Sequence, residues 1–162
     1  MRRPTSSPEI SDQTTEVPGR RGLALGMLDG LLGFHVRMAQ AAIYRDFAAS
    51  LAPLDITQKQ FATLELIACN PGVSQIDLAA TLGTDRATMM ALVDRLDARG
   101  WVERAVSAVD RRRQELRLTA TGRADLDRAR AMAVAHEERL LDGISSAERT
   151  TLAAVLGRIH AR

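Results

Sequence analysis

Residues 74–119 read SQIDLAATLGTDRATMMALVDRLDARGWVERAVSAVDRRRQELRLT, and this stretch decides the fold. Its first part carries apolar residues at helical spacing, Ile76, Ala79, Ala80 and Leu82. Ser74 is suited to the start of a helix, because its hydroxyl can accept a hydrogen bond from an orphan backbone N–H. Gly83 is the residue type favoured just past a helix end. The pattern therefore predicts a short helix that stops at Gly83.

A second helix is predicted to open at Thr84–Asp85 and to close at Gly100. Its apolar residues recur at the i, i+3, i+4, i+7 spacing of one buried face, Met89, Leu92, Val93 and Leu96. Two helices joined by a short turn with glycine are typical of a helix-turn-helix, although any corner between two helices can look the same.

A basic hairpin is predicted directly after the second helix. Residues 101–105 and 114–118 have strand character, and Asp110-Arg111-Arg112-Arg113 lies between them. A basic loop at a hairpin tip beside a helix-turn-helix is a wing. The second helix can then enter a major groove of DNA while the tip reaches phosphates or an adjacent minor groove.

With these residues the chain resembles the MarR family of winged-helix transcriptional regulators. The matching pieces are LGTDRATMMALVDRLDARGWVER and VDRRRQELRLTATG. The family's wing pattern is Asp-x-Arg followed by Leu-Thr-x-x-Gly, which this chain supplies with Asp110, Arg112, Leu118, Thr119 and Gly122. The resemblance covers residues 28–159. It implies a mainly α fold with a small β-hairpin wing, a winged helix-turn-helix with N- and C-terminal dimerisation helices.

Composition limits the class of protein without proving nucleic-acid binding. The chain has 162 residues, 46% of them hydrophobic, which suits one domain with a real core. The formal net charge is only +2, so the cluster of arginines at 111–113 is more informative than the total. A single cysteine allows no intrachain disulfide and no cysteine metal cage. We expect a cytoplasmic protein with no cofactor and no metal. We also expect no membrane segment, because the apolar stretch at residues 23–34 is too short to span a bilayer.

The rest of the chain reads as helices around this lobe. Further helices are predicted at about 25–51, from a capping box at Thr57 and Gln60 to Cys69, from 120 to about 141, and from a capping box at Ser145 and Glu148. We divide the chain into four parts: a flexible tail (1–22), a first dimerisation helix and loop (23–56), a winged helix-turn-helix lobe (57–119) and C-terminal dimerisation helices (120–162).

The terminal helices carry apolar stripes that suggest a homodimer. The first stripe consists of Leu28, Leu31, Leu32, His35, Met38, Ala39 and Ala42. Packing of these stripes within one chain is the simpler reading. The family resemblance implies a dimer instead, and a DNA reader gains register and affinity by presenting two equivalent helices to two half-sites.

Candidate DNA-binding residues lie on the helix-turn-helix and the wing. They are Ser74, Gln75, Thr84, Asp85, Arg86, Ala87, Thr88, Met90, Ala91, Asp110, Arg111, Arg112 and Arg113. Arg86 can bond guanine O6 and N7, or it is a solvated charge paired with Asp85 or Asp94. Ala87, Met90, Ala91 and Asp94 form the face opposite the apolar stripe, where contact with thymine methyl groups is possible.

The resemblance also assigns roles at the wing tip. Arg112 aligns with the family's wing arginine, which a narrow minor groove attracts. Asp110 would orient an arginine by a charge-assisted hydrogen bond, and Arg111 and Arg113 would bind phosphates.

An effector site is predicted on the first helix. Family members bind small aromatic acids, and some bind aromatic acyl-CoA thioesters. His35, Arg37 and Tyr44 could receive such a ligand, although His35 could equally be a core histidine and Arg37 and Tyr44 a solvated face. We therefore predict a ligand-responsive regulator, a repressor released from a pseudo-palindromic operator by an aromatic acid or its CoA thioester.

Competing functions are weaker. The chain lacks a nucleophile elbow, a P-loop and histidines at metal-ligand spacing, and His136-Glu137-Glu138 reads as an exposed helix face, so we predict no enzyme. Cys69 is expected to be a buried structural residue; an oxidant-sensing regulator that uses it is the alternative. A helical dimeric adaptor that binds no DNA would leave the basic wing unexplained.

Overall fold

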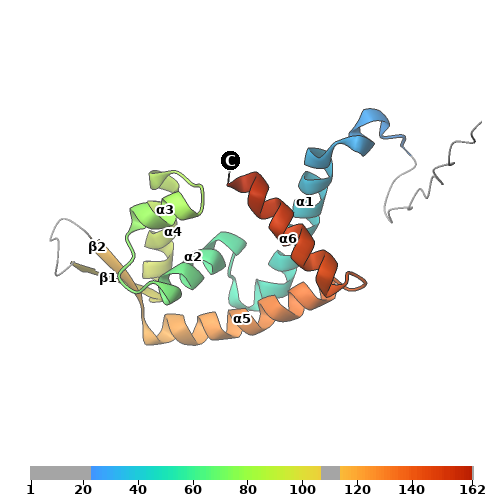
Figure 1. The fold of residues 1–162 in the computed structure, drawn as a ribbon. Helices are drawn as coiled ribbons and strands as arrows, with labels where there is room; N and C mark the ends of the chain where they lie inside the picture. Colours follow the sequence, from blue (N-terminus) through green and yellow to red (C-terminus); the bar gives the residue numbers. More distant parts are fainter. Residues whose placement is uncertain (1–22, 107–113, 162) are drawn as a thin grey trace, which may run out of the picture. The chain divides into compact units, whose positions relative to one another are not determined.

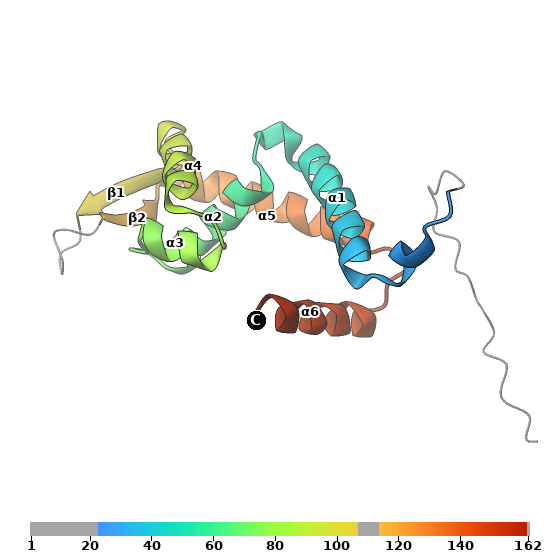
Figure 2. The same cartoon turned by 90° about the horizontal axis from the view of Figure 1, so that it is seen from above.

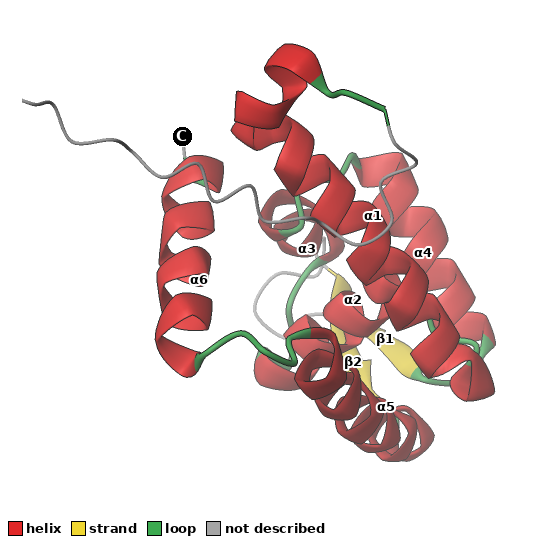
Figure 3. Cartoon of the chain, turned by 90° about the vertical axis from the view of Figure 1, so that its right-hand side faces the viewer, coloured by secondary structure: helices red, strands yellow, loops and turns green. Residues whose placement is uncertain are grey.

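The computed structural model describes residues 23–106 and 114–161. These fall into two units, one ending at Val36 and one starting at Arg37, and each is described by itself. Figure 1 shows the elements in chain order, and Figure 3 shows that helices dominate, with one pair of strands.

The first unit holds a 3-10 helix, Gly26–Gly30, and the start of α1 (Leu32–Leu51). The predicted continuous helix from residue 25 is therefore wrong at its beginning. Leu31 has extended backbone (φ −94°, ψ 108°), and Gly26 has a positive φ of 54°. Glycine populates such conformations readily and lowers helix stability, so the chain makes a separate turn before α1.

The second unit begins with the rest of α1, whose end and connection to α2 (Gln58–Cys69) follow from local chemistry. A short 3-10 turn, Ala52–Leu54, with proline near its start, stops α1. Thr57 and Gln60 make the predicted capping box, in which each side chain bonds the other residue's backbone N–H.

The helix-turn-helix consists of α3 (Gln75–Thr81) and α4 (Arg86–Ala98). Gly83, at φ 58°, makes the turn between them, as predicted. The buried face of α3 differs from the prediction: Ile76 is 55% exposed, whereas Leu78 and Ala79 are buried. In a helix of about two turns, the position of the neighbouring helices decides which apolar residues turn inward, and spacing alone does not reveal it.

The wing strands are β1 (Val102–Val106) and β2 (Gln114–Leu118), paired antiparallel from Val102↔Leu118 to Val106↔Gln114. Val73 adds an isolated bridge to Leu116, which ties the turn before α3 to the hairpin. Figure 2 shows the hairpin beside α3 and α4.

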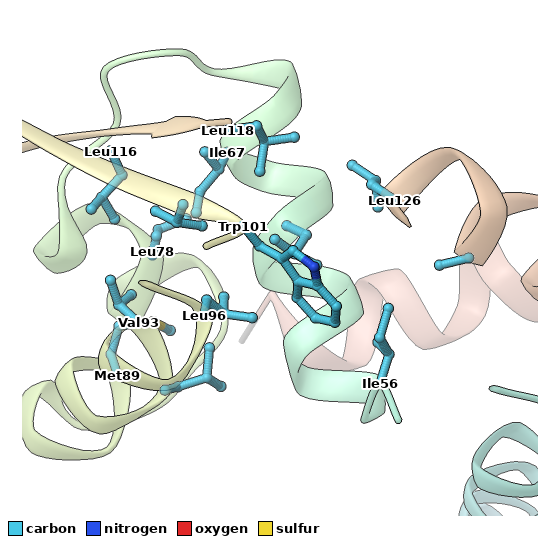
Figure 4. Packing of buried hydrophobic residues seen from close by; sticks show 14 of the residues in the cluster. Ile56, Ile67, Leu78, Met89, Val93, Leu96, Trp101, Leu116, Leu118 and Leu126 are labelled. Carbon is cyan, nitrogen blue, oxygen red and sulfur yellow. The ribbon is translucent and has the colours of Figure 1, made fainter. Parts of the chain in front are cut away.

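The core lies between α2, the helix-turn-helix, the hairpin and α5 (Ala120–Leu140). Figure 4 shows side chains from all these elements converging, among them Ile67, Leu78, Val93, Leu96, Leu116 and Leu126. The predicted stripe on α4, Met89 to Leu96, is buried as expected. This core fixes the orientation of α4 and therefore of its opposite, exposed face.

The last helix, α6 (Ser146–His160), begins at the predicted capping box of Ser145 and Glu148. It has no buried residue, and it exposes Leu152, Leu156 and Ile159 by 37–52%. Among the described helices, none combines the length and apolar character needed to cross a membrane.

Candidate nucleic-acid interface

The start of α4 is built by a side-chain cap. The Asp85 carboxylate accepts the Thr88 backbone N–H at 2.8 Å and the Thr88 hydroxyl at 2.6 Å. These bonds, the hydroxyl bond first, lower the pKa of Asp85 below its ordinary value, which keeps the carboxylate charged. Asp85 and the Thr88 hydroxyl are therefore engaged with each other and hold the first turn of α4.

The face of α4 opposite the core is open. Arg86, Ala87, Met90 and Ala91 are all exposed, and Met90 keeps 53% of its surface accessible. The guanidinium of Arg86 stands at the first turn of this face, followed by small and apolar side chains. Such a face can approach base edges closely, offering one strong donor group and contacts to thymine methyl groups.

Three other predicted contact residues have structural roles. Ser74 is buried, accepts the Asp77 N–H at 3.2 Å and donates to the Asp77 carboxylate at 2.7 Å, so it caps α3. Thr84 is half-buried and donates its backbone N–H to Ala79. Gln75, the first residue of α3, is half-buried. DNA contacts by these residues stay predictions.

The acidic residue on the exposed face of α4 is paired with the wing. Asp94 forms an ion pair with Arg104 of β1, whose Nε also lies 3.7 Å from Asp97. The pairing neutralises an anion that would otherwise repel phosphates, and it joins α4 to the base of the hairpin. Sequence reasoning missed this contact, because Asp94 and Arg104 belong to different elements.

Arg99, at the end of α4, is also engaged within the chain. Its guanidinium stacks on Trp101, 3.6 Å from the ring centroid, and donates to the backbone oxygens of Leu54 and Asp55. The stack and hydrogen bonds fix the junction between α4, β1 and the turn before α2.

The wing tip, which includes the predicted residues Asp110, Arg111, Arg112 and Arg113, lies outside the described residues. The Thr-x-x-Gly part of the wing pattern is described, and its role is structural. Thr119 caps α5 through Gly122 N–H and donates to Gly100 O. A Cβ on Gly122 would lie 2.0 Å from the Trp101 carbonyl oxygen, so only glycine fits.

A cavity of about 470 Å³ is lined by residues of α1, α2, α5 and the end of α3, and every lining residue belongs to the second unit. Its lining includes Phe47, Phe61, Leu66, Leu82, Ala133 and His136. The rings of Phe47 and Phe61 are 5.8 Å apart, and Phe47 meets His136 edge to face at 5.4 Å. Its volume lies within the range of small-molecule sites in proteins.

The prediction that His136 belongs to an exposed face is wrong, since only 2% of its surface is accessible. Its Nδ1 donates to the Asp46 carboxylate at 2.6 Å, and Arg139 donates to the same carboxylate at 3.2 Å. The His136 hydrogen bond is the main cause that lowers the pKa of Asp46, ahead of Arg139. Asp46 lies on α1, far away in sequence, which hid the pair from sequence reasoning.

The predicted effector residues occupy exposed positions. His35 is in the first unit, where its Nε2 donates to the Asp29 carbonyl at 2.7 Å, so it is not a core histidine. Arg37 is exposed, and Tyr44, 54% exposed, borders a smaller cavity of about 220 Å³. Neither Arg37 nor Tyr44 lines the cavity of about 470 Å³.

Cys69 is exposed at the end of α2, so the prediction of a buried cysteine is wrong. Its thiol donates to Glu65 at 3.7 Å. In the described parts of the chain, no group of three potential ligand side chains could hold a metal ion.

Comparison with known proteins identifies relatives that cover most of this chain. The model of the MarR family matches residues 54–113. A protein of Thauera aromatica described as a putative transcriptional regulatory protein for the hcr operon is 34% identical over 139 residues, covering 85% of this chain and 84% of the relative. An HTH-type transcriptional repressor of Mycobacterium tuberculosis is 28% identical, covering 81% of this chain and 94% of the relative.

Solved structures agree in fold. The transcriptional repressor CouR bound to a 23-mer DNA duplex is 40% identical, covers 86% of this chain and 99% of its own, and has a TM-score of 0.82. CouR bound to p-coumaroyl-CoA is 37% identical, covers 85% and 97%, and has a TM-score of 0.78. Apo MarR from Escherichia coli is 28% identical, covers 80% and 96%, and has a TM-score of 0.68. These proteins are regulators and not enzymes, and this chain belongs to the MarR family of DNA-binding transcriptional regulators.

Proposed function

We propose that the protein is a homodimeric repressor that binds a pseudo-palindromic operator and is released by an aromatic acid or its CoA thioester. The observation that carries the DNA-binding part is the exposed face of α4, with Arg86 at its start and its acidic residue neutralised by Arg104. The similar repressor CouR has been solved on a DNA duplex, which supports this assignment.

The dimer is supported by apolar surface that a single chain leaves uncovered. Only Phe47 and Leu51 of α1 are buried, and no residue of α6 is. Large contiguous apolar surfaces on a soluble protein mark interaction sites. The proposed interface consists of residues 23–56 and 120–162, and it would present two winged lobes, residues 57–119, to successive major grooves.

The proposed DNA contacts are of two kinds, contacts to base edges from α4 and contacts to phosphates and the minor groove from the wing. Arg86 would read guanine, and Met90 and Ala91 would meet thymine methyl groups. Arg111 and Arg113 would bind phosphates, and Arg112 would insert into a narrow minor groove. Asp110 would orient one of these arginines. Arg112→Ala should then weaken binding and leave fold and dimer intact.

The effector part is supported by the cavity between α1, α2 and α5 and by the solved complex of CouR with p-coumaroyl-CoA. An aromatic acyl group fits the cavity's aromatic walls and volume. Arg37 and Tyr44 of the second unit are candidates for the carboxylate or the CoA phosphates, and the role of His35, which lies in the first unit, stays a prediction. Binding would favour one arrangement of the dimer helices over another and so change the distance between recognition helices.

Fluorescence anisotropy with DNA from upstream of the protein's own gene tests this function. Wild-type affinity should fall steeply with salt, since phosphate neutralisation releases counterions. Arg86→Ala should weaken binding by about 10-fold or more, the loss expected for a bidentate base contact of about 1–3 kcal/mol. Arg128→Ala, which removes an arginine from the exposed surface of α5, is the matched control and should bind normally. Equal affinities of both variants would contradict the role given to α4.

A further inference from the structure

A cluster of polar side chains joins α1 to the last turns of α5. The Asp46 carboxylate of α1 accepts hydrogen bonds from His136 Nδ1 at 2.6 Å and from Arg139 at 3.2 Å. The same Arg139 guanidinium donates to the Ser50 hydroxyl at 2.8 Å. Among the described residues of the second unit, these are the hydrogen bonds that link side chains of α1 to another helix. The attachment of α1 to α5 therefore depends on a small number of directional contacts.

The cluster restrains α1 on α5 both along the helix axis and in rotation. Asp46 and Ser50 lie one turn apart on one face of α1. Their partners, His136 and Arg139, are three residues apart and share a face of α5 in the same way. Sliding or turning one helix against the other would lengthen or misalign these bonds, which weaken steeply with poor geometry. The apolar packing around Phe47 is non-directional and tolerates a small shift.

The helix α5 carries this restraint to the winged helix-turn-helix lobe. Its first half packs in the core of that lobe, where Leu126 and Ala129 are fully buried. From Gly122 to His136 the helix spans about 20 Å, at about 1.5 Å per residue. A rotation of about 10° at the cluster would therefore move the lobe by about 3.5 Å, close to the spacing of about 3.4 Å between neighbouring base pairs.

We propose that Asp46 is a positioning residue for DNA binding: it sets the angle between α1 and α5 and thereby the half-site spacing that the dimer accepts. The inference rests on the proposed dimeric repressor and adds the residue that controls the geometry of its two lobes. The His136 hydrogen bond lowers the pKa of Asp46, so the carboxylate stays charged and accepts from both of its partners. Without this carboxylate each lobe still folds, but the distance between the two lobes is no longer fixed.

Two operators of different half-site spacing test this role. One is DNA from upstream of the protein's own gene, and the other carries one extra base pair between its half-sites. In fluorescence anisotropy, wild type should bind the longer operator about 10-fold or more weakly, because one half-site then loses its base contacts. Asp46→Ala should reduce this ratio at least about threefold, since loosely held lobes can follow the longer spacing. Its affinity for a single half-site should equal that of wild type.

Two further variants control for size and charge. Asp46→Asn keeps the shape of the side chain and an oxygen acceptor for His136, so its ratio should lie between those of wild type and Asp46→Ala. Glu138→Ala removes an exposed carboxylate from α5, two residues from His136, and should keep the wild-type ratio.

The distance between the two lobes can also be measured without DNA. Cys69 is the single cysteine of the chain and lies exposed at the end of α2, so a nitroxide label there marks each lobe once. Pulsed electron paramagnetic resonance on the labelled wild-type dimer should give one narrow distance distribution. Asp46→Ala should broaden this distribution while the dimer mass and the helix content stay unchanged.

The outcomes separate this inference from the proposed function. If wild type is monomeric or binds no DNA, the proposed function fails and the inference fails with it. If the wild-type dimer binds both operators equally, or if Asp46→Ala keeps the wild-type ratio or the narrow distribution, the repressor stands and the role of Asp46 is overturned. If Asp46→Ala loses helix content, the same two measurements on Asp46→Asn decide.

Discussion

At the scale of single residues, specific side-chain contacts hold the elements of the winged helix-turn-helix lobe in place. The helix and strand propensities of its residues do not by themselves determine this arrangement. Asp85 holds the first turn of α4, Arg104 neutralises Asp94, and Arg99 clamps the turn before α2. Gly122 belongs to the same group, since the first turn of α5 packs against the Trp101 carbonyl. The family's wing pattern thus combines residues predicted to bind DNA with residues, Thr119 and Gly122, that allow α5 to pack against the start of the wing.

Gly122→Ala should destabilise the protein by about 1–3 kcal/mol, the range for forcing an extra atom into a packed site. The three atoms nearest its Cβ are all backbone atoms of Trp101, which cannot move aside as a side-chain tip could. Urea denaturation measures the change. Ala124→Ser, which adds one atom on the exposed side of the same helix, should stay within about 0.5 kcal/mol of wild type. Equal stability of the two variants would show that α5 can shift freely at this point.

At the scale of elements, the ion pair between Glu65 of α2 and Arg130 of α5 joins the lobe to the long helix. The hydrogen bonds from Arg130 are the main cause that lowers the pKa of Glu65 below its ordinary 4.5. A lowered folded-state pKa means that the unfolded chain binds the proton more tightly. The stabilisation is therefore fully present above pH 4.5 and is lost as pH falls through the lower folded value.

Glu65→Gln should remove part of this pH dependence. Both side chains are partly exposed, so the effect at neutral pH should be no more than about 1 kcal/mol. Urea midpoints measured from about pH 7 to pH 3 should converge for wild type and variant at the acidic end. Glu138→Gln, at an exposed carboxylate on α5, should follow the wild-type curve. A constant gap between wild type and Glu65→Gln at every pH would contradict the ion-pair explanation.

Sequence reasoning succeeded where structure is local. The caps at Thr57, Ser74 and Ser145, the turn at Gly83 and the strand at Gln114–Leu118 follow from residues within a few positions of one another. The errors concern which side chains are buried. Ile76, Cys69 and His136 were misplaced because burial depends on helices far away in sequence, as with Asp46 and His136.

The two parts of the candidate site, the recognition helix and the cavity, also differ in how far the sequence predicts them. The recognition helix and its open face could be predicted from its buried stripe, since the two faces are complementary. The cavity could not, because α1, α2 and α5 each contribute side chains that no spacing relates.

At the scale of the whole molecule, the proposed repressor consists of two chains. The uncovered apolar residues of α6 predict that a chain ending at Asp142 loses the dimer, which multi-angle light scattering would detect as a halved mass. Circular dichroism should show that the winged lobe still folds, since no residue of α6 belongs to the core. A dimer that survives this truncation would remove α6 from the interface.

The most direct test of the central claim is a hydroxyl-radical footprint of the full-length protein on DNA from upstream of its own gene. Two α4 helices in successive major grooves predict two protected patches on one face of the duplex, about 10–10.5 base pairs apart from centre to centre. Adding p-hydroxycinnamoyl-CoA should erase both patches together, because a single dimer makes them. A single patch, or uniform weak protection that the thioester leaves unchanged, would contradict the account.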